Sequence, residues 1–247
     1  MTTEGHALVV GATSGIGAQV AEQLAAQGWR VSRFGRSAAG PGAFACDVTD
    51  ARSVAAAFAA ATDAQGEPRA LVYCAGTGVF GRAAAIPVDR ARACMDVGFW
   101  GMDACIRQVL PAFERRGNGQ IVGVLSVVAM IGVAHEAYYA ASKAAAQRYL
   151  DCLRVELEPA GVRVRYVCPG YVATGFRERS GWFGIEPGAV QGSGVTAADV
   201  ARAVVRTLHG QDVSPILGWR ERVITTAGRV APGLYESWQA LRRKRDG

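Results

Sequence analysis

Short apolar runs alternate with longer amphipathic segments along most of this chain. Five runs have the length and composition of buried strands, namely residues 7–10, 30–34, 71–74, 121–126 and 162–167. Helical composition and apolar spacing mark residues 15–27, 54–61, 88–115, 137–158 and 197–209, and a last amphipathic segment contains Leu234, Tyr235, Trp238 and Leu241. The repeated alternation predicts a parallel sheet with helices on both faces.

One stretch interrupts this rhythm. Residues 175–194 are rich in glycine and show no clear period, so we expect a mobile loop that acts as a lid. No linker or internal repeat is apparent, and 247 residues is a natural size for one α/β unit. We therefore expect a single domain over residues 1–247, with the lid at about 175–194.

The composition narrows the class of protein. Hydrophobic residues make up 50% of the chain and charged residues 19%, which is typical of a globular protein. No apolar run reaches the length of a membrane span, and the first residues lack the features of a signal peptide, so a cytoplasmic location is expected. The six cysteines are scattered, which favours small core residues over disulfides, and no metal site is expected.

The net charge of +6 raises the question of an anionic partner. Part of this charge lies in residues 242–245, which are all arginine or lysine. Four consecutive basic residues are typical of a helix end exposed to solvent, where positive charges also interact favourably with the helix dipole. An anionic surface or partner remains the alternative, whereas no nucleic acid is expected.

A glycine-rich turn follows the first apolar run and precedes the first helical segment. Gly11, Gly15 and Gly17 have the spacing of a turn whose backbone approaches a pyrophosphate, while the helix N-terminus supplies free N–H groups. At the end of the second run, Gly35 stands where an acidic residue would bind the ribose hydroxyls of NAD. Arg36 follows, and its guanidinium suits a 2′-phosphate, so NADP(H) is favoured. The alternatives are a tight turn without a ligand and a solvated arginine.

The chemistry-bearing residues lie further along the chain. Tyr139 and Lys143 are one helical turn apart, and Ser126 ends the buried run at 121–126. A nearby ammonium favours the phenolate of a tyrosine whose ordinary pKa is about 10. Tyr139 can then exchange a proton with a substrate oxygen that the Ser126 hydroxyl binds. Tyr138 is adjacent, but only Tyr139 has a lysine four residues later.

Together these residues resemble the short-chain dehydrogenase/reductase family over about residues 6–210. The resemblance implies a Rossmann-like, doubly wound parallel sheet of about seven strands, with helices on both faces. It implies Ser126, Tyr139 and Lys143 as the catalytic residues, and a homodimer or homotetramer built on the helices at 88–115 and 137–158, with Phe99, Trp100, Tyr149 and Leu153 in the interface. With Arg36, the expected cofactor contacts are Gly11, Thr13, Ser14, Gly15, Ile16, Gly17, Arg36, Ser37, Asp47, Val48, Ala75, Gly76, Tyr139, Lys143, Pro169, Gly170, Val172 and Thr174.

Two positions depart from the family pattern. Gly98 stands where the family usually has an asparagine that helps to hold a water linking the lysine to solvent. Either a second water fills the space that glycine leaves, or the enzyme is slowed or altered. Cys74 also replaces a usual asparagine, which should affect the chemistry little.

The expected function is an NADP-dependent oxidoreductase that interconverts a ketone and a secondary alcohol. A nucleotide-binding sensor or scaffold with little turnover, and a redox-neutral epimerase, are the alternatives. An apolar substrate is favoured by the candidate pocket residues Phe80, Val128, Val133, His135, Tyr171, Phe176, Trp182 and Phe183, although His135 and the lid aromatics can equally be ordinary loop residues.

Overall fold

The computed structural model describes residues 5–186, 194–210 and 215–245. Its centre is a parallel sheet with the strand order β3-β2-β1-β4-β6-β7. The strands are β1 (His6–Val10), β2 (Arg30–Gly35), β3 (Ala43–Ala45), β4 (Pro68–Tyr73), β6 (Gly119–Val124) and β7 (Val162–Val167). All five predicted runs therefore form strands of one sheet.

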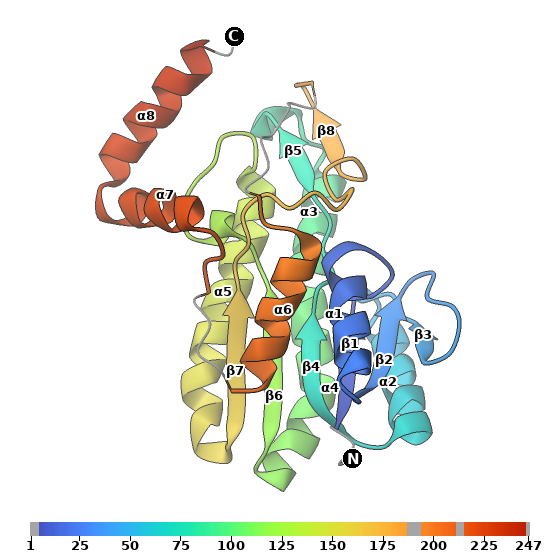
Figure 1. Ribbon diagram of the computed structural model, residues 1–247. Helices are drawn as coiled ribbons and strands as arrows, with labels where there is room; N and C mark the ends of the chain where they lie inside the picture. The colour runs from blue at the N-terminus through green and yellow to red at the C-terminus, as the bar shows by residue number, and fades with distance from the viewer. Residues whose placement is uncertain (1–4, 187–193, 211–214, 246–247) are drawn as a thin grey trace.

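Helices cover both faces of the sheet (Figure 1). One face packs against α1 (Gly15–Ala26) and α6 (Ala197–Leu208). The other packs against α2 (Ala51–Gln65), α4 (Gly101–Arg116) and α5 (Ala137–Leu157). Short 3₁₀ helices occupy Ala83–Ala85, Val127–Ala129 and Glu158–Ala160. The predicted doubly wound α/β fold is confirmed.

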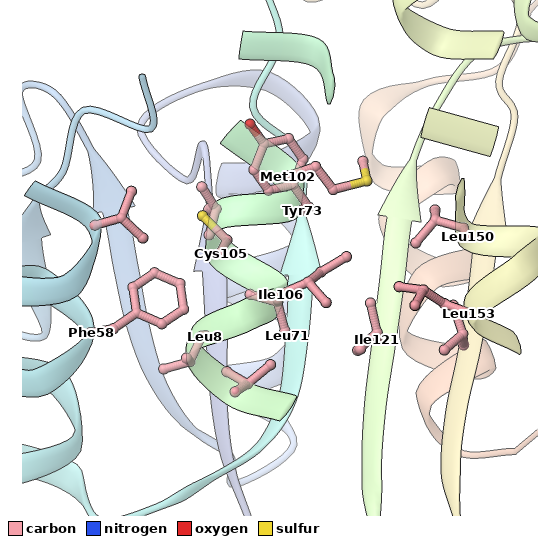
Figure 2. Packing of buried hydrophobic residues seen from close by; sticks show 14 of the residues in the cluster. Leu8, Phe58, Leu71, Tyr73, Met102, Cys105, Ile106, Ile121, Leu150 and Leu153 are labelled. Atoms are coloured by element: carbon pink, nitrogen blue, oxygen red, sulfur yellow. The ribbon is translucent and has the colours of Figure 1, made fainter. Parts of the chain in front are cut away.

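The second of these faces contains more of the buried aromatic side chains than the first. Figure 2 shows side chains of three neighbouring strands, Leu8, Leu71 and Ile121, facing side chains from the helices, Phe58, Met102, Cys105, Ile106, Leu150 and Leu153. Burying each large side chain of this kind contributes about 1.5–3 kcal/mol. This packing holds the carboxyl ends of the strands, where the candidate site lies, in fixed positions.

Two details differ from the predicted sheet. The described residues contain six strands in the main sheet instead of seven, and the seventh position is represented by a single parallel bridge between Cys168 and Ile216. In addition, β5 (Val79–Gly81) pairs with β8 (Gly181–Phe183) as a separate two-stranded parallel sheet beyond the carboxyl ends of the main strands. These two strands are too short to give a periodic signal.

The predicted long helix at 88–115 is divided. It consists of α3 (Val88–Met95), a π-helical turn (Asp96–Trp100) and α4. The hydroxyl of the buried Tyr73 donates a hydrogen bond to the carbonyl of Val97 at 2.6 Å, which satisfies a backbone group within the widened turn. Such π-helical turns are frequent at functional sites.

The chain ends in α7 (Trp219–Val230) and α8 (Pro232–Arg245), which extend away from the sheet (Figure 1). The basic residues 242–245 thus belong to the end of a helix, as predicted. No helix in the described part of the chain is both long and apolar enough to cross a membrane. All six cysteines are free thiols; the prediction of core positions is wrong for Cys152, which is exposed on α5.

Candidate active site

The strand order reverses between β1 and β4, and such a reversal is the place where open α/β sheets bind ligands. Gly11 leaves β1 with φ +81°, and a Cβ there would lie 2.6 Å from the backbone nitrogen of Ala75. A Cβ on Gly17 would lie 2.1 Å from the carbonyl oxygen of Gly11. Only glycine fits both positions, so the predicted turn has the close packing that a phosphate-binding loop requires.

The N-terminus of α1 opens directly from this turn. Ser14 is the N-cap, but its side chain makes no capping hydrogen bond, and the first turn of α1 contains no acidic residue. The first backbone N–H groups and the positive end of the helix dipole therefore remain available to an anion. This loop and helix N-terminus fit the pyrophosphate of a dinucleotide.

The end of β2 lies beside the same turn. A Cβ on Gly35 would lie 2.5 Å from Cγ2 of Thr13, so a larger side chain at this position would require Thr13 to shift. The exposed Arg36 follows. Nearby, Asp47 accepts hydrogen bonds from the backbone and hydroxyl of Thr49, and these bonds, together with the charge of Arg36, lower the pKa of Asp47. The predicted adenosine-side residues thus lie together.

The three residues predicted to be catalytic also converge. Ser126 lies two residues beyond β6, while Tyr139 and Lys143 are on the first two turns of α5. Ser126 and Tyr139 interact through their hydroxyl groups. Lys143 is 4% exposed; its Nζ donates to the carbonyl of Val124 at 3.2 Å and lies 5.8 Å from the centre of the Tyr139 ring.

Burial dominates the electrostatics of this group. It raises the pKa of Tyr139, as does the nearby charge of Glu136, whereas the hydrogen bond with Ser126 and the charge of Arg177 lower it. Burial also lowers the pKa of Lys143. The expectation that the lysine brings the pKa of Tyr139 down toward neutrality is therefore not met, and Tyr139 is protonated at neutral pH.

Aromatic side chains surround the Tyr139 ring. Phe80 of β5 packs edge-on at 5.7 Å between ring centres, and Phe176 packs at 5.6 Å. Phe80 also contacts Trp182 of β8, at 5.1 Å. We call residues 175–186 the lid segment; residues 187–193 of the predicted lid lie outside the described residues. Three of the predicted pocket residues are thus gathered near Tyr139.

The other predicted pocket residues differ in exposure. Val128 is buried, whereas Val133, Tyr171 and Phe183 are partly exposed. His135 is exposed and has φ +68°, and its carbonyl accepts a hydrogen bond from the backbone of Gly81. His135 therefore matches the alternative interpretation of a loop residue.

An ion pair beside Tyr139 was missed by the sequence analysis. Arg177 Nη1 donates to Glu136 Oε1 at 2.8 Å, and both side chains are largely buried. The Arg177 guanidinium also lies 4.3 Å from the centre of the Phe80 ring. Glu136 precedes α5 and Arg177 lies in an irregular segment, so neither position carries a periodic signal that could connect them.

The space beside Gly98 is filled by a side chain. A Cβ on Gly98 would lie 2.8 Å from Oγ and 2.9 Å from Cβ of Ser142, which is buried. Ser142 Oγ donates to the carbonyl of Tyr139 at 2.8 Å. Ser142 therefore occupies the space directly beside Gly98.

We therefore expect Gly98→Asn to destabilise the protein by about 1–3 kcal/mol, because overpacking forces Ser142 and the first turns of α5 to shift. Denaturant unfolding measures this change. Gly233→Asn is the matched control: a Cβ at Gly233 meets nothing within 4 Å, so its effect should stay within about 0.5 kcal/mol. If Gly98→Asn had the same free energy of unfolding as the wild type, α5 would have shifted to accommodate the asparagine without loss of stability, and the expectation would be wrong.

Comparison with known proteins agrees with this geometry. The family model described as short chain dehydrogenase matches residues 5–181. Dehydrogenase/reductase SDR family member 7B of Mus musculus is 28% identical over 97% of this chain and 81% of that protein. The short-chain reductase protein NovJ of Streptomyces niveus is 35% identical over 70% of this chain and 71% of that protein.

A solved structure extends the likeness to three dimensions. A short chain dehydrogenase from Burkholderia cenocepacia J2315, in complex with NADP, has a TM-score of 0.80 and 29% identity, and the match covers 97% of this chain and 99% of that one. The chain belongs to the short-chain dehydrogenase family. It is therefore an oxidoreductase of the class that uses a nicotinamide dinucleotide. Among the described residues, no three His, Cys, Asp or Glu side chains gather as a metal site.

Proposed function

We propose that this protein is an NADP(H)-dependent oxidoreductase that interconverts a ketone and a secondary alcohol. The observation that carries the proposal is the convergence of Ser126 and Lys143 on Tyr139 at the carboxyl ends of the strands. A half-buried phenol beside a serine hydroxyl can bind a carbonyl oxygen and supply it with a proton. The bound nicotinamide supplies the hydride.

Each residue has a distinct part in this proposal. Tyr139, protonated at neutral pH, donates its proton to the substrate oxygen during reduction. Ser126 hydrogen-bonds the same oxygen and orients it. Lys143 would hold the nicotinamide ribose, and its ammonium lies 5.8 Å from the centre of the Tyr139 ring. The pyrophosphate would lie on Gly11, Gly17 and the N-terminus of α1.

The substrate side supports an apolar or aromatic carbonyl compound. Phe80, Phe176 and Trp182 present ring faces and edges close to Tyr139. The test of the proposed function is NADPH oxidation with a panel of aliphatic and aromatic ketones. Turnover with some members supports it, whereas dinucleotide binding without turnover of any ketone favours the sensor or the epimerase.

The choice of NADP(H) rests on Arg36. We expect Arg36→Ala to weaken NADPH about tenfold or more and to leave the affinity for NADH nearly unchanged, because only NADPH loses a charge-assisted contact to the 2′-phosphate. Titration of both cofactors into both proteins measures this difference. Equal losses for the two cofactors would show that Arg36 does not bind the 2′-phosphate.

We further propose a cytoplasmic homodimer or homotetramer that uses α4 and α5. Trp100 is 58% exposed, and Phe99 and Tyr149 contact each other beside it with ring centres 5.7 Å apart. Leu153 does not belong to this surface, because it is 7% exposed and packs in the core (Figure 2).

A further inference from the structure

The last two helices, α7 and α8, turn large apolar side chains toward solvent. We call residues 219–245 the C-terminal arm; it extends away from the sheet (Figure 1). On α7, Trp219, Val223 and Val230 recur at helical spacing along one face, and each is between 60% and 80% exposed. We call these three residues the apolar stripe. On α8, Leu234 is 76% exposed as well.

The opposite face of α7 is the one that packs against the protein. Thr225 is fully buried, and the side chain of Glu221 lies beside the backbone of Gly170. Gly228 lies beside the side chain of Ile131. A surface helix ordinarily buries its apolar face and exposes its polar one. In α7 this order is reversed, so the packing of the described residues does not account for the apolar stripe.

The C-terminal arm is also strongly basic. Residues 219–245 contain seven basic and two acidic residues, so most of the net charge of +6 lies in this short part of the chain. Helical spacing places Arg220 on one side of the apolar stripe, and Arg222 and Arg229 on the other. The Arg220 guanidinium lies 5.5 Å from the centre of the Trp219 ring. The stripe is therefore bordered by positive charge on both sides.

This combination of charge and apolar surface selects among possible partners. A second copy of the arm has the same excess of positive charge, so two arms brought face to face would repel each other. An anionic lipid bilayer instead offers negative headgroups to the arginines and an apolar layer directly beneath them. Tryptophan is enriched at that boundary.

We propose that the C-terminal arm docks on the surface of an anionic lipid bilayer, with the apolar stripe among the headgroups and the flanking arginines at the level of the phosphates. With 12 residues, α7 is shorter than the about 20 residues that span a bilayer, so it lies along the surface. This inference goes beyond the proposed function and does not depend on it.

The arm is joined to the part of the protein that holds the substrate side of the site. Gln239 Nε2 donates to the carbonyl of Gly132 at 2.6 Å, and Gly228 lies beside Ile131. Ile131 and Gly132 belong to the segment that connects β6 to α5, the helix on which Tyr139 lies. Docking of the arm therefore keeps this side of the protein near the lipid, where apolar compounds dissolve.

The first experiment measures co-sedimentation of the whole protein with vesicles. One set of vesicles is made of phosphatidylcholine alone, and the other contains phosphatidylglycerol as well. We expect the protein to sediment with the anionic vesicles and to stay largely in the supernatant with the neutral ones. Binding to the anionic vesicles should weaken as sodium chloride is added, because salt screens the attraction between the arginines and the headgroups.

Matched variants locate the binding surface. Val223→Asp should weaken binding to the anionic vesicles about tenfold or more, since it removes an inserted side chain and adds a negative charge. Val88→Asp is its control, because Val88 is a helical valine of similar exposure on α3, 64% against 60%. It should bind as the wild type does. Denaturant unfolding checks that both variants keep their fold.

A second pair of variants tests the charge without disturbing the apolar stripe. Replacing Arg220 and Arg229 together with glutamine should weaken binding about tenfold or more. Replacing Arg52 and Arg69, which are exposed and lie outside the arm, removes the same charge from the protein and should have little effect. Equal losses in the two double variants would show that net charge alone attracts the vesicles, and would overturn the role of the arm.

Other outcomes also contradict the proposal. Equal binding of the wild type to neutral and anionic vesicles would remove the argument from charge. Equal binding of Val223→Asp and Val88→Asp would place the contact elsewhere on the protein. If the wild type binds neither kind of vesicle and Val223→Asp dissociates an oligomer in analytical ultracentrifugation, the apolar stripe is a contact between copies of this chain. None of these results bears on the reduction of ketones, so the proposed function is tested separately.

Discussion

Replacing Tyr139 with phenylalanine is expected to lower turnover by about 10²–10⁴-fold while the protein still folds and binds the dinucleotide. The ring packs against Phe80 and Phe176, and phenylalanine keeps those contacts. Only the hydroxyl is lost, and with it the proton donor and the interaction with Ser126. Steady-state kinetics with a reactive ketone, together with a dinucleotide titration, measure both parts of the expectation.

Tyr138→Phe is the matched control for this change. Tyr138 packs in a small apolar cluster with Val79, Ile86 and Cys94, and its ring would stay in place. Its turnover should remain within a few-fold of the wild type. Near-normal turnover in Tyr139→Phe would falsify the proposed mechanism.

The raised pKa of Tyr139 adds a pH dependence. Burial puts this pKa above its ordinary value of about 10, so the phenol keeps its proton throughout the neutral range. Reduction, which needs the protonated form, should be insensitive to this group up to about pH 10. Oxidation needs the phenolate and should increase with pH. A loss of reduction between pH 6 and 8 that disappears in Tyr139→Phe would contradict this assignment.

The arrangement of the sheet could be predicted because each strand and helix is marked by a pattern of neighbouring residues in the sequence. Each strand is a short apolar run next to a turn or a helix with its own pattern, and parallel strands require crossover helices. The glycine-rich turn was predictable for a similar reason. At Gly11 the backbone has a positive φ, and at Gly17 it lies too close to a neighbouring carbonyl for any side chain to fit. The spacing of these glycines therefore predicts the shape of the turn.

The contacts around the substrate side were not predictable in the same way. Strands β5 and β8 have three residues each and pair across about 100 intervening positions, so no periodicity marks them. The ion pair between Glu136 and Arg177 lies against these two strands, because the Arg177 guanidinium packs over the rings of Phe80 and Trp182. Likewise, the sequence shows the absence of an asparagine at Gly98, but only the packing of α5 shows that Ser142 occupies the space.

Replacing Lys143 with methionine should lower the activity of the protein and raise its stability. Lys143 is almost completely buried, and the hydrogen bond that its ammonium donates to Val124 leaves most of the desolvation cost uncompensated. Methionine has a similar volume and no charge. We expect unfolding free energy to rise by about 1 kcal/mol or more at neutral pH, and turnover to fall at least about 10²-fold. Denaturant unfolding and steady-state kinetics test the two effects on the same preparation.

The pH dependence of stability tests whether the buried ammonium of Lys143 causes the difference in stability between the wild type and the methionine variant. Burial lowers the pKa of Lys143 in the folded protein below its ordinary value of 10.5, so between these two values the unfolded chain binds more protons than the folded one. Wild-type stability should therefore gain a contribution as pH rises through that window toward 10.5, and the methionine variant should lack that contribution. A variant that is both less active and less stable, with an unchanged pH dependence, would mean that Lys143 is held by favourable packing and hydrogen bonding. A variant that is more stable but inactive means that the protein retains a costly buried ammonium because the reaction beside Tyr139 requires it.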